Sequence, residues 1–304
     1  MQGSLSLARW PMQTSLIIAD SFRWVILGSN GMIGSELKAL VLAVNSRKTL
    51  SALRTIDHPI ESYLDAVQVL IQAESSDARP LRIVFCAGKG GFSLDQSSAA
   101  LQAKMFESLC NQLRYESSIE KLIFISSLGA RCSKLPSPYQ SLMRTNEKVA
   151  LSVFPDRSLI LRMPSLYGVN SHSNSLHGLI GLMLANLRRR VPTDIYSHLE
   201  TRRNYLSICS ISKYLRGNFA MDDLFRRKGV LNIQASSSKS VYEISSHFWR
   251  AVRLRPILRL RNPEPLSSEY HFPYKLDGAR LIIRDDVESW IKAQWIRCSL
   301  RSQS

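Results

Sequence analysis

A glycine-rich turn between an apolar run and a helical pattern constrains the fold of this chain more than any other segment. The run from Trp24 to Leu27 leads directly into Gly28-Ser29-Asn30-Gly31-Met32-Ile33-Gly34, and a helical pattern continues to Val44. In such a strand-turn-helix unit, Gly28 permits the tight turn, Gly31 lets the backbone approach a pyrophosphate, and Gly34 lets helix and strand pack closely. The alternative is a purely structural turn. The residues predicted to line the dinucleotide site are Gly28, Asn30, Gly31, Met32, Ile33 and Gly34.

The first half of the chain alternates short apolar runs with helix-length segments. Strands are expected at 24–27, 50–53, 82–85, 121–125 and 158–161, and helices at 32–44, 97–115 and 138–153. This alternation predicts βαβ units whose parallel strands form a sheet covered on both faces. The predicted fold class is therefore α/β, a Rossmann-type doubly wound parallel sheet.

The pattern changes after about Pro164, which indicates a second, smaller unit. Helical segments at 176–189, 210–220 and 241–252 alternate with proline- and arginine-rich connections. We therefore expect an N-terminal extension (1–23), a dinucleotide-binding Rossmann domain (24–164) and a smaller C-terminal substrate-binding lobe (165–304).

The charge balance favours anionic partners. Lys and Arg total 40 against 24 Asp and Glu, a formal net charge of +16, which suits a phosphorylated substrate, a nucleic acid or an acidic membrane surface. The arginine clusters at 188–190, 202–203, 226–228 and 250–261 match no nucleic-acid-binding module. We therefore expect a basic surface and no nucleic-acid partner.

Other features of the composition point to a cytoplasmic protein with reduced thiols. The five cysteines are odd in number and widely spaced, which is not typical of a disulfide framework or a metal site. No apolar run is long enough for a membrane-spanning helix, and the first residues lack a secretory pattern. We expect no metal and no transmembrane segment.

The end of the second predicted strand bears on the choice of nicotinamide cofactor. An acidic residue there would accept hydrogen bonds from the ribose and repel a 2′-phosphate. The chain carries Arg54 instead, whose guanidinium can pair with that phosphate. We therefore expect Arg54 to contact the cofactor and favour NADP, with NAD as the alternative.

Several further stretches occur in a fixed order along the chain. They are Phe85-Cys86-Ala87-Gly88, Phe124 to Ala130, Pro138 to Glu147, Leu161 to Gly168, Arg202 to Ile208, Gly229 to Ile233 and Ser240 to Phe248. Together with the glycine turn they span about residues 24–250. In this order they resemble the extended short-chain dehydrogenases/reductases, the NAD(P)-dependent epimerase/dehydratase family.

The resemblance implies an oxidoreductase, epimerase or dehydratase that acts on a nucleotide-activated sugar, in surface-polysaccharide synthesis. It implies catalytic roles for Ser127 and Tyr139, with Tyr139 also near the cofactor. It further implies that Ala87 and Gly88 line the cofactor site. Ser165 and Arg203 are the implied substrate-binding residues, and residues 229–235 are expected to return to the sheet. The oligomeric state stays open, with a homodimer through the tyrosine helix as one option.

One residue departs from the family pattern at the position that matters most for catalysis. The family has a lysine four residues after the tyrosine, and this chain has Met143. That lysine lowers the pKa of the tyrosine and binds the nicotinamide ribose, and Met143 can do neither. Arg144 is rotated by about 100° from that helix face, so it is either a solvated charge or a partial substitute. The alternative function is therefore a catalytically impaired, NAD(P)-binding relative that senses redox state or binds a partner.

Overall fold

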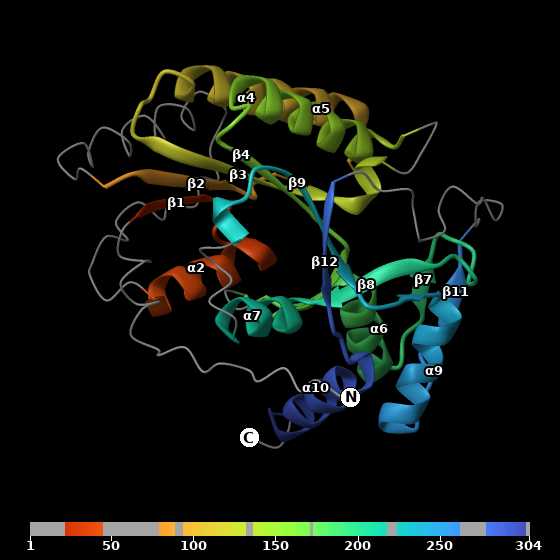
Figure 1. Ribbon diagram of the computed structural model, residues 1–304. Helices are drawn as coiled ribbons and strands as arrows, with labels where there is room; N and C mark the ends of the chain where they lie inside the picture. The colour runs from red at the N-terminus through yellow and green to blue at the C-terminus, as the bar shows by residue number, and fades with distance from the viewer. Residues whose placement is uncertain are drawn as a thin grey trace, which may run out of the picture.

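A parallel six-stranded sheet forms the centre of the molecule (Figure 1). The computed structural model describes residues 22–44, 79–88, 94–131, 136–170, 173–217, 224–261 and 278–301. In spatial order the strands are β1 (Arg23–Leu27), β2 (Leu81–Phe85), β3 (Ile119–Ser127), β4 (Ser158–Met163), β9 (Gly229–Ala235) and β12 (Ala279–Ile283). Residues 1–21, the strand expected at 50–53 and Arg54 lie outside the described residues.

The parallel register places three predicted segments at one edge of the sheet. Leu27 is the register partner of Phe85, and Ser127 is the partner of Met163. The glycine turn, the Ala87–Gly88 loop and Ser127 therefore all lie where strands end, at the carboxyl edge of the sheet. Ligands bind at this edge in open α/β sheets.

Helices cover both faces of the sheet, as the buried strands require. Figure 1 shows α4 (Gln96–Leu113) and α5 (Pro138–Val153) above the sheet, with α2 (Met32–Val44) and α7 (Ile208–Gly217) below it. One apolar core lies between the sheet and the helices α4 and α5. The other lies between the sheet and the helices α2 and α7. Every residue of β1 and β2 is buried, as expected for strands covered on both faces. The prediction of a Rossmann-type α/β fold is confirmed.

Local sequence explains where α5 begins. Ser137 is the N-cap, and its hydroxyl accepts a hydrogen bond from the Gln140 N–H while the Gln140 side chain accepts from the Ser137 N–H. This reciprocal capping box satisfies two N–H groups that the first helical turn leaves open. Pro138 fits the first turn because its missing N–H has no helical partner there. Tyr139 is therefore held on the first turn of α5.

The C-terminal part of the chain builds smaller sheets beside the main one. The strands β5 (Ser165–Val169), β6 (Leu176–His177), β8 (Arg203–Ser207) and β10 (Ser238–Lys239) form one sheet, and β7 (Thr193–Ile195) with β11 (Leu258–Leu260) forms another. The helices α6 (Gly178–Arg189), α9 (Val241–Val252) and α10 (Val287–Arg301) pack around them. In the first part of the chain, the short helix η1 (Leu128–Arg131) follows β3. A third core, which includes Tyr167 stacked edge-on against Trp290, holds this part together.

Two strands return from this region to the main sheet. β9 covers the predicted 229–235 return and pairs with β4, and β12 adds a sixth strand beside β9 that the sequence analysis did not predict. Asn204 on β8 links the two sheets, because its side-chain amide donates to the Ala235 carbonyl and its oxygen accepts from the Ala235 N–H at 2.6 Å. None of the described helices is both long and apolar enough to cross a bilayer.

Candidate active site

The glycine turn has the backbone geometry that the sequence predicted for it. Gly28 has a φ of +91°, and a Cβ there would lie 2.6 Å from the Ala87 nitrogen. A Cβ on Gly34 would lie 2.1 Å from the Gly28 carbonyl oxygen. Both positions therefore exclude side chains, because backbone atoms cannot move aside cheaply.

The middle glycine of the turn, Gly31, lies just before the first residue of α2. Gly31 is exposed, and its N–H donates to the Gly28 oxygen at 3.1 Å just before α2 begins. Beside it, the Ser29 hydroxyl is buried and has no hydrogen-bond partner among the described residues. A helix N-terminus attracts anions, and a hydroxyl without a partner can donate to one. These features fit a dinucleotide pyrophosphate, although the contacts of Asn30, Met32 and Ile33 with a cofactor stay a prediction.

The loop after β2 packs directly on the glycine turn. The Cys86 thiol donates to the Leu27 carbonyl at 3.1 Å, and burial raises the pKa of this thiol to about 12. Gly88 has a φ of +120°, and a Cβ there would lie 2.5 Å from the Gln102 side chain. Ala87 therefore packs against Gly28 of the turn, and the contact of Ala87 and Gly88 with a cofactor stays a prediction.

Ser127 and Tyr139 meet at the end of β3. The Ser127 hydroxyl lies beside the Tyr139 phenol, and the Ser127 oxygen accepts a hydrogen bond from the Gly129 N–H at 3.1 Å. Burial of the phenol raises the pKa of Tyr139, and the nearby Ser127 hydroxyl offsets part of that rise. The pair can orient a substrate oxygen and exchange a proton with it, but Tyr139 is held as a neutral phenol at neutral pH.

Met143 fills the position that the family gives to lysine. Its side chain is 9% exposed and belongs to the apolar core under α5. The next residue, Arg144, is turned toward η1, where its Nε donates to the Ala130 carbonyl. Arg144 is therefore bonded to the backbone just after Ser127 and is not a fully solvated helix charge.

A buried ion pair joins α5 to the two central strands. Glu147 accepts from the Ser126 hydroxyl at 2.5 Å, from the Arg162 Nε at 2.9 Å and from the Arg162 Nη2 at 2.6 Å. Glu147 and Arg162 are 5% and 2% exposed. The sequence analysis missed this contact. Arg162 lies in a strand whose other residues are mostly apolar, and nothing in that segment indicates Glu147 as its partner.

The two predicted substrate-binding residues lie on neighbouring strands. Ser165 begins β5 and is the register partner of Tyr205 in β8, which Arg203 begins. The adjacent Arg202 is bound elsewhere, since it donates to the Ser238 carbonyl at 2.8 Å and to Glu243 at 3.0 Å. The arrangement brings Ser165 and Arg203 onto one small sheet, and their contact with substrate stays a prediction.

Asn170 is a site neighbour that the sequence analysis missed. Its amide donates to the Asn30 carbonyl in the glycine turn at 3.0 Å, and the residue is buried. The contact joins residues 140 positions apart, so no local pattern could have indicated it. It ties the strand that carries Ser165 to the glycine turn. Among the described residues, no group of three or more His, Cys, Asp or Glu side chains is placed to hold a metal ion.

Comparison with solved structures identifies the fold. MoeE5 in complex with UDP-glucose and NAD superposes with a TM-score of 0.66 at 17% identity, covering 91% of this chain and 99% of that one. UDP-glucose 4-epimerase from Thermotoga maritima gives 0.63 at 16% identity, with coverage of 91% and 99%. UDP-glucuronic acid 4-epimerase from Bacillus cereus gives 0.64 at 14% identity, with coverage of 90% and 98%.

The fold is that of UDP-sugar 4-epimerases. No protein-family model and no curated protein sequence matches the chain. Among the described residues, the glycine turn and Ser127 lie at the carboxyl edge of the sheet, Tyr139 lies on the first turn of α5, and Ser165 and Arg203 lie on the small sheet beside the main sheet.

Proposed function

We propose that this chain is an NAD(P)-dependent oxidoreductase of the epimerase/dehydratase type that acts on a nucleotide-activated sugar. The observation that carries the proposal is that Ser127 and Tyr139 lie together at the same sheet edge as the glycine turn. The similar structures hold NAD together with UDP-glucose or UDP-glucuronic acid. They support a pyridine dinucleotide as the cofactor and a UDP-sugar as the substrate.

The residues of the site divide the work between binding and proton transfer. The turn from Gly28 to Gly34 and the start of α2 would hold the pyrophosphate of the dinucleotide. A bound nicotinamide would supply hydride exchange with a sugar carbon. Ser127 would donate a hydrogen bond to the reacting sugar oxygen, and Tyr139 would give or take the proton at its hydroxyl. Ser165 and Arg203 would hold the phosphates of the substrate.

Met143 should slow the proposed proton transfer by Tyr139. A cation there would favour the phenolate form of Tyr139, and the buried thioether of Met143 has no charge. From the usual size of acid-base contributions, we expect a loss of about 3 to 4 kcal/mol of transition-state stabilisation. This corresponds to a rate lower by roughly a hundredfold to a thousandfold.

The same observation favours a second candidate function. Met143 belongs to the buried apolar core, so its side chain contributes packing and no charge. A protein of this kind would bind the dinucleotide as a redox-sensing or partner-binding ligand and would turn over no sugar. The two candidates differ in catalysis and share cofactor binding.

A substitution at the methionine separates the two candidates. We expect Met143→Lys to raise the rate of NADPH or NADH oxidation about a hundredfold with a panel of UDP-4-keto-sugars, measured by the loss of reduced-nicotinamide absorbance. Met143→Leu is the uncharged control and should leave the rate unchanged. Adding Tyr139→Phe to Met143→Lys should remove the gain. Cofactor binding by calorimetry without turnover in any variant would favour the second candidate.

The finer expectations stay predictions. A preference for NADP rests on Arg54, and calorimetric titration of the protein with NADP and NAD tests it. A role in surface-polysaccharide synthesis and a homodimer also stay predictions, the latter testable by light scattering after size-exclusion chromatography.

A further inference from the structure

The fold brings together two arginine-rich segments that lie far apart in the sequence. α6 ends at Arg189, so Arg188 and Arg189 are its last residues and Arg190 is its C-cap. α9 ends at Val252, and Arg253 is its C-cap. The strands that follow, β7 and β11, pair in parallel, and the Thr193 N–H donates to the Ile257 carbonyl at 2.7 Å. The segments that follow the two helices therefore lie side by side, at the right of Figure 1 where β7 and β11 are labelled, away from α2.

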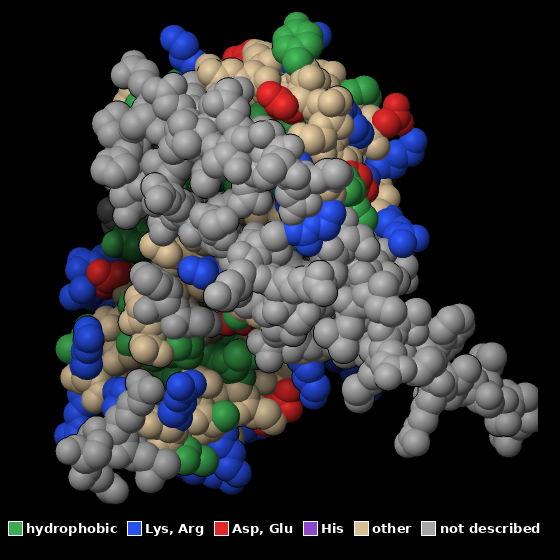
Figure 2. All heavy atoms as spheres, turned by 90° about the vertical axis from the view of Figure 1, so that its left-hand side faces the viewer, with side chains coloured by type: hydrophobic (Ala, Val, Ile, Leu, Met, Phe, Trp, Pro, Cys, Tyr) green, Lys and Arg blue, Asp and Glu red, His purple; other side chains and the backbone are tan. Residues whose placement is uncertain are grey.

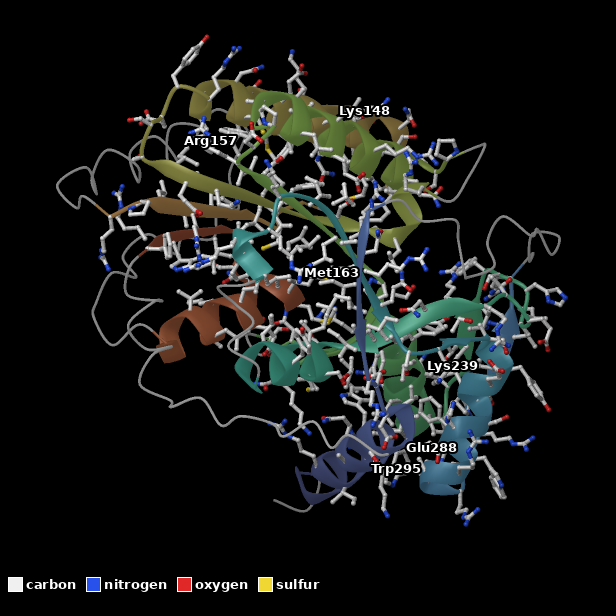
Figure 3. All side chains as sticks on the ribbon, viewed as in Figure 1. Lys148, Arg157, Met163, Lys239, Glu288 and Trp295 are labelled. Atoms are coloured by element: carbon white, nitrogen blue, oxygen red, sulfur yellow. The ribbon has the colours of Figure 1, made fainter. Side chains whose placement is uncertain are left out.

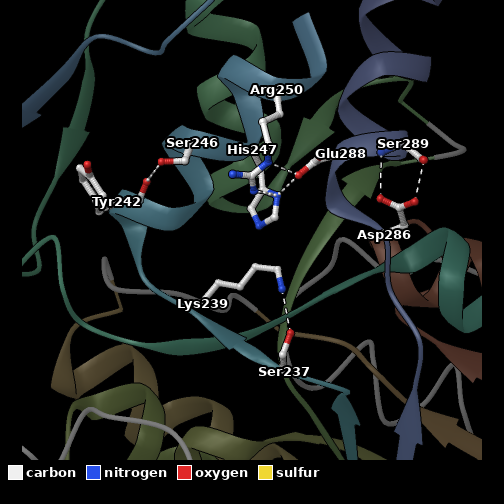
Figure 4. Close-up of polar contacts among 9 residues, drawn as sticks. All are labelled: Ser237, Lys239, Tyr242, Ser246, His247, Arg250, Asp286, Glu288 and Ser289. Carbon is white, nitrogen blue, oxygen red and sulfur yellow. Dashed lines mark hydrogen bonds and ion pairs between the residues drawn. The ribbon is translucent and has the colours of Figure 1, made fainter.

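This surface has a large excess of positive charge. Segment 188–196 holds three arginines and segment 249–261 holds five, which makes eight, and Asp194 is the one acidic residue in both segments. Asp194 pairs with Arg259 at 3.0 Å, and Arg250 pairs with Glu288 beside His247 (Figure 4). Figure 2 shows the face on the left of Figure 1, where Lys and Arg side chains are seen at several separate places among the described residues.

Four of the arginines keep their charge facing solvent. Arg189, Arg190, Arg253 and Arg255 are exposed, and no carboxylate among the described residues pairs with any of them. Arg255 lies over the Trp249 ring, with its guanidinium carbon 5.7 Å from the ring centroid. The Arg255 charge is therefore held beside an aromatic ring, and all four exposed charges are available to an anion.

Exposed apolar side chains are interleaved with these charges. Val191 is 41% exposed, Trp249 44%, Leu254 43% and Ile257 54%. We define the basic-apolar patch by its members: Arg189, Arg190, Val191, Trp249, Arg253, Leu254, Arg255 and Ile257. A solvated basic surface would need none of the four apolar side chains, so the patch combines two kinds of attraction.

We propose that the basic-apolar patch binds the surface of an anionic phospholipid bilayer. The arginines would pair with lipid phosphates, and Trp249 would lie at the level of the headgroups, where its amphipathic ring is favoured. Val191, Leu254 and Ile257 would enter the boundary with the acyl chains. A nucleic acid could use the arginines, but aliphatic side chains gain little on a phosphate backbone.

Vesicle sedimentation tests the charged part of the proposal. The protein should sediment with vesicles of phosphatidylcholine and phosphatidylglycerol, not with phosphatidylcholine alone, and binding should weaken as salt is raised. Arg189→Gln with Arg255→Gln should weaken binding about thirtyfold. The control pair, Lys148→Gln with Lys213→Gln, removes the same charge from exposed positions on α5 and α7 and should bind normally. Lys148 lies on the opposite layer, at the top of Figure 3.

A second pair of variants tests the apolar part. Ile257→Ser should weaken vesicle binding about fivefold, because half-exposed isoleucine surface would be buried against lipid. Leu101→Ser on α4 is the matched control, since Leu101 is 56% exposed, and it should bind normally. Three results would overturn the proposal: no binding to anionic vesicles, equal weakening in patch and control variants, or binding of a labelled oligonucleotide without vesicle binding.

Discussion

Removing the Glu147 carboxylate tests how the catalytic helix is held against the sheet. Glu147 on α5 accepts three hydrogen bonds, two from Arg162 on β4 and one from Ser126 on β3. Glu147→Ala would leave the Arg162 guanidinium charged at 2% exposure. A buried charge that loses its ion-pair partner costs about 3 to 5 kcal/mol, so we expect the free energy of unfolding to fall by that amount.

Denaturant and thermal unfolding measure this loss. For a chain of this size we expect the midpoint temperature to fall by roughly 6 to 20 °C, at about 2 to 4 °C per kcal/mol. Glu288→Ala is the matched control, because it also removes a carboxylate from an arginine, Arg250, but at a surface where its side chain is 37% exposed. Such a pair contributes about 0 to 1 kcal/mol.

A double substitution distinguishes a lost charge balance from lost packing. Replacing both Glu147 and Arg162 with methionine removes both charges, and we expect it to recover most of the stability that Glu147→Ala loses. The reasoning is refuted if Glu147→Ala loses no more than Glu288→Ala. It is also refuted if the double variant is less stable than the single one.

Two further predictions concern the glycine turn and the phenol. Gly34→Ala should lower the free energy of unfolding in denaturant by about 1 to 3 kcal/mol, because its Cβ would lie 2.1 Å from the Gly28 oxygen. Gly31→Ala should cost less, because its Cβ would lie 3.3 Å from that oxygen. Equal losses in the two variants would contradict the prediction. Because burial raises the pKa of Tyr139, sugar oxidation should still accelerate with pH at about 10, the ordinary tyrosine pKa. Met143→Lys should move this rise to lower pH, and an unchanged pH-rate profile would argue against Tyr139 as the base.

Sequence patterns were sufficient where a structural signal is local. The helix predicted at 241–252 is α9, with a capping box between Ser240 and Glu243, and the helices predicted at 32–44 and 138–153 have the bounds of α2 and α5. The glycine turn was equally readable, because glycine spacing, a preceding strand and a following helix act within a few residues. The place of Ser127 and Tyr139 followed from the order of the surrounding motifs.

Tertiary structure decided how these local pieces meet. It paired Glu147 with Arg162, joined Asn170 to the glycine turn, and gave Asn204 a backbone-like role between two strands. Each of these contacts depends on which strands become neighbours, and a residue pattern along one segment does not encode its neighbours in space.

The sequence by itself determined that this chain forms a doubly wound sheet with a glycine turn between the first strand and the first helix, because apolar periodicity and glycine conformations are properties of short segments. It also showed that position 143 holds no cation. Only the tertiary structure decided that Met143 is packed into the core, that Arg144 bonds to the backbone after Ser127, and that two distant arginine segments share one surface. Burial and charge clustering arise from the packing of whole elements, so they appear only when the fold is complete.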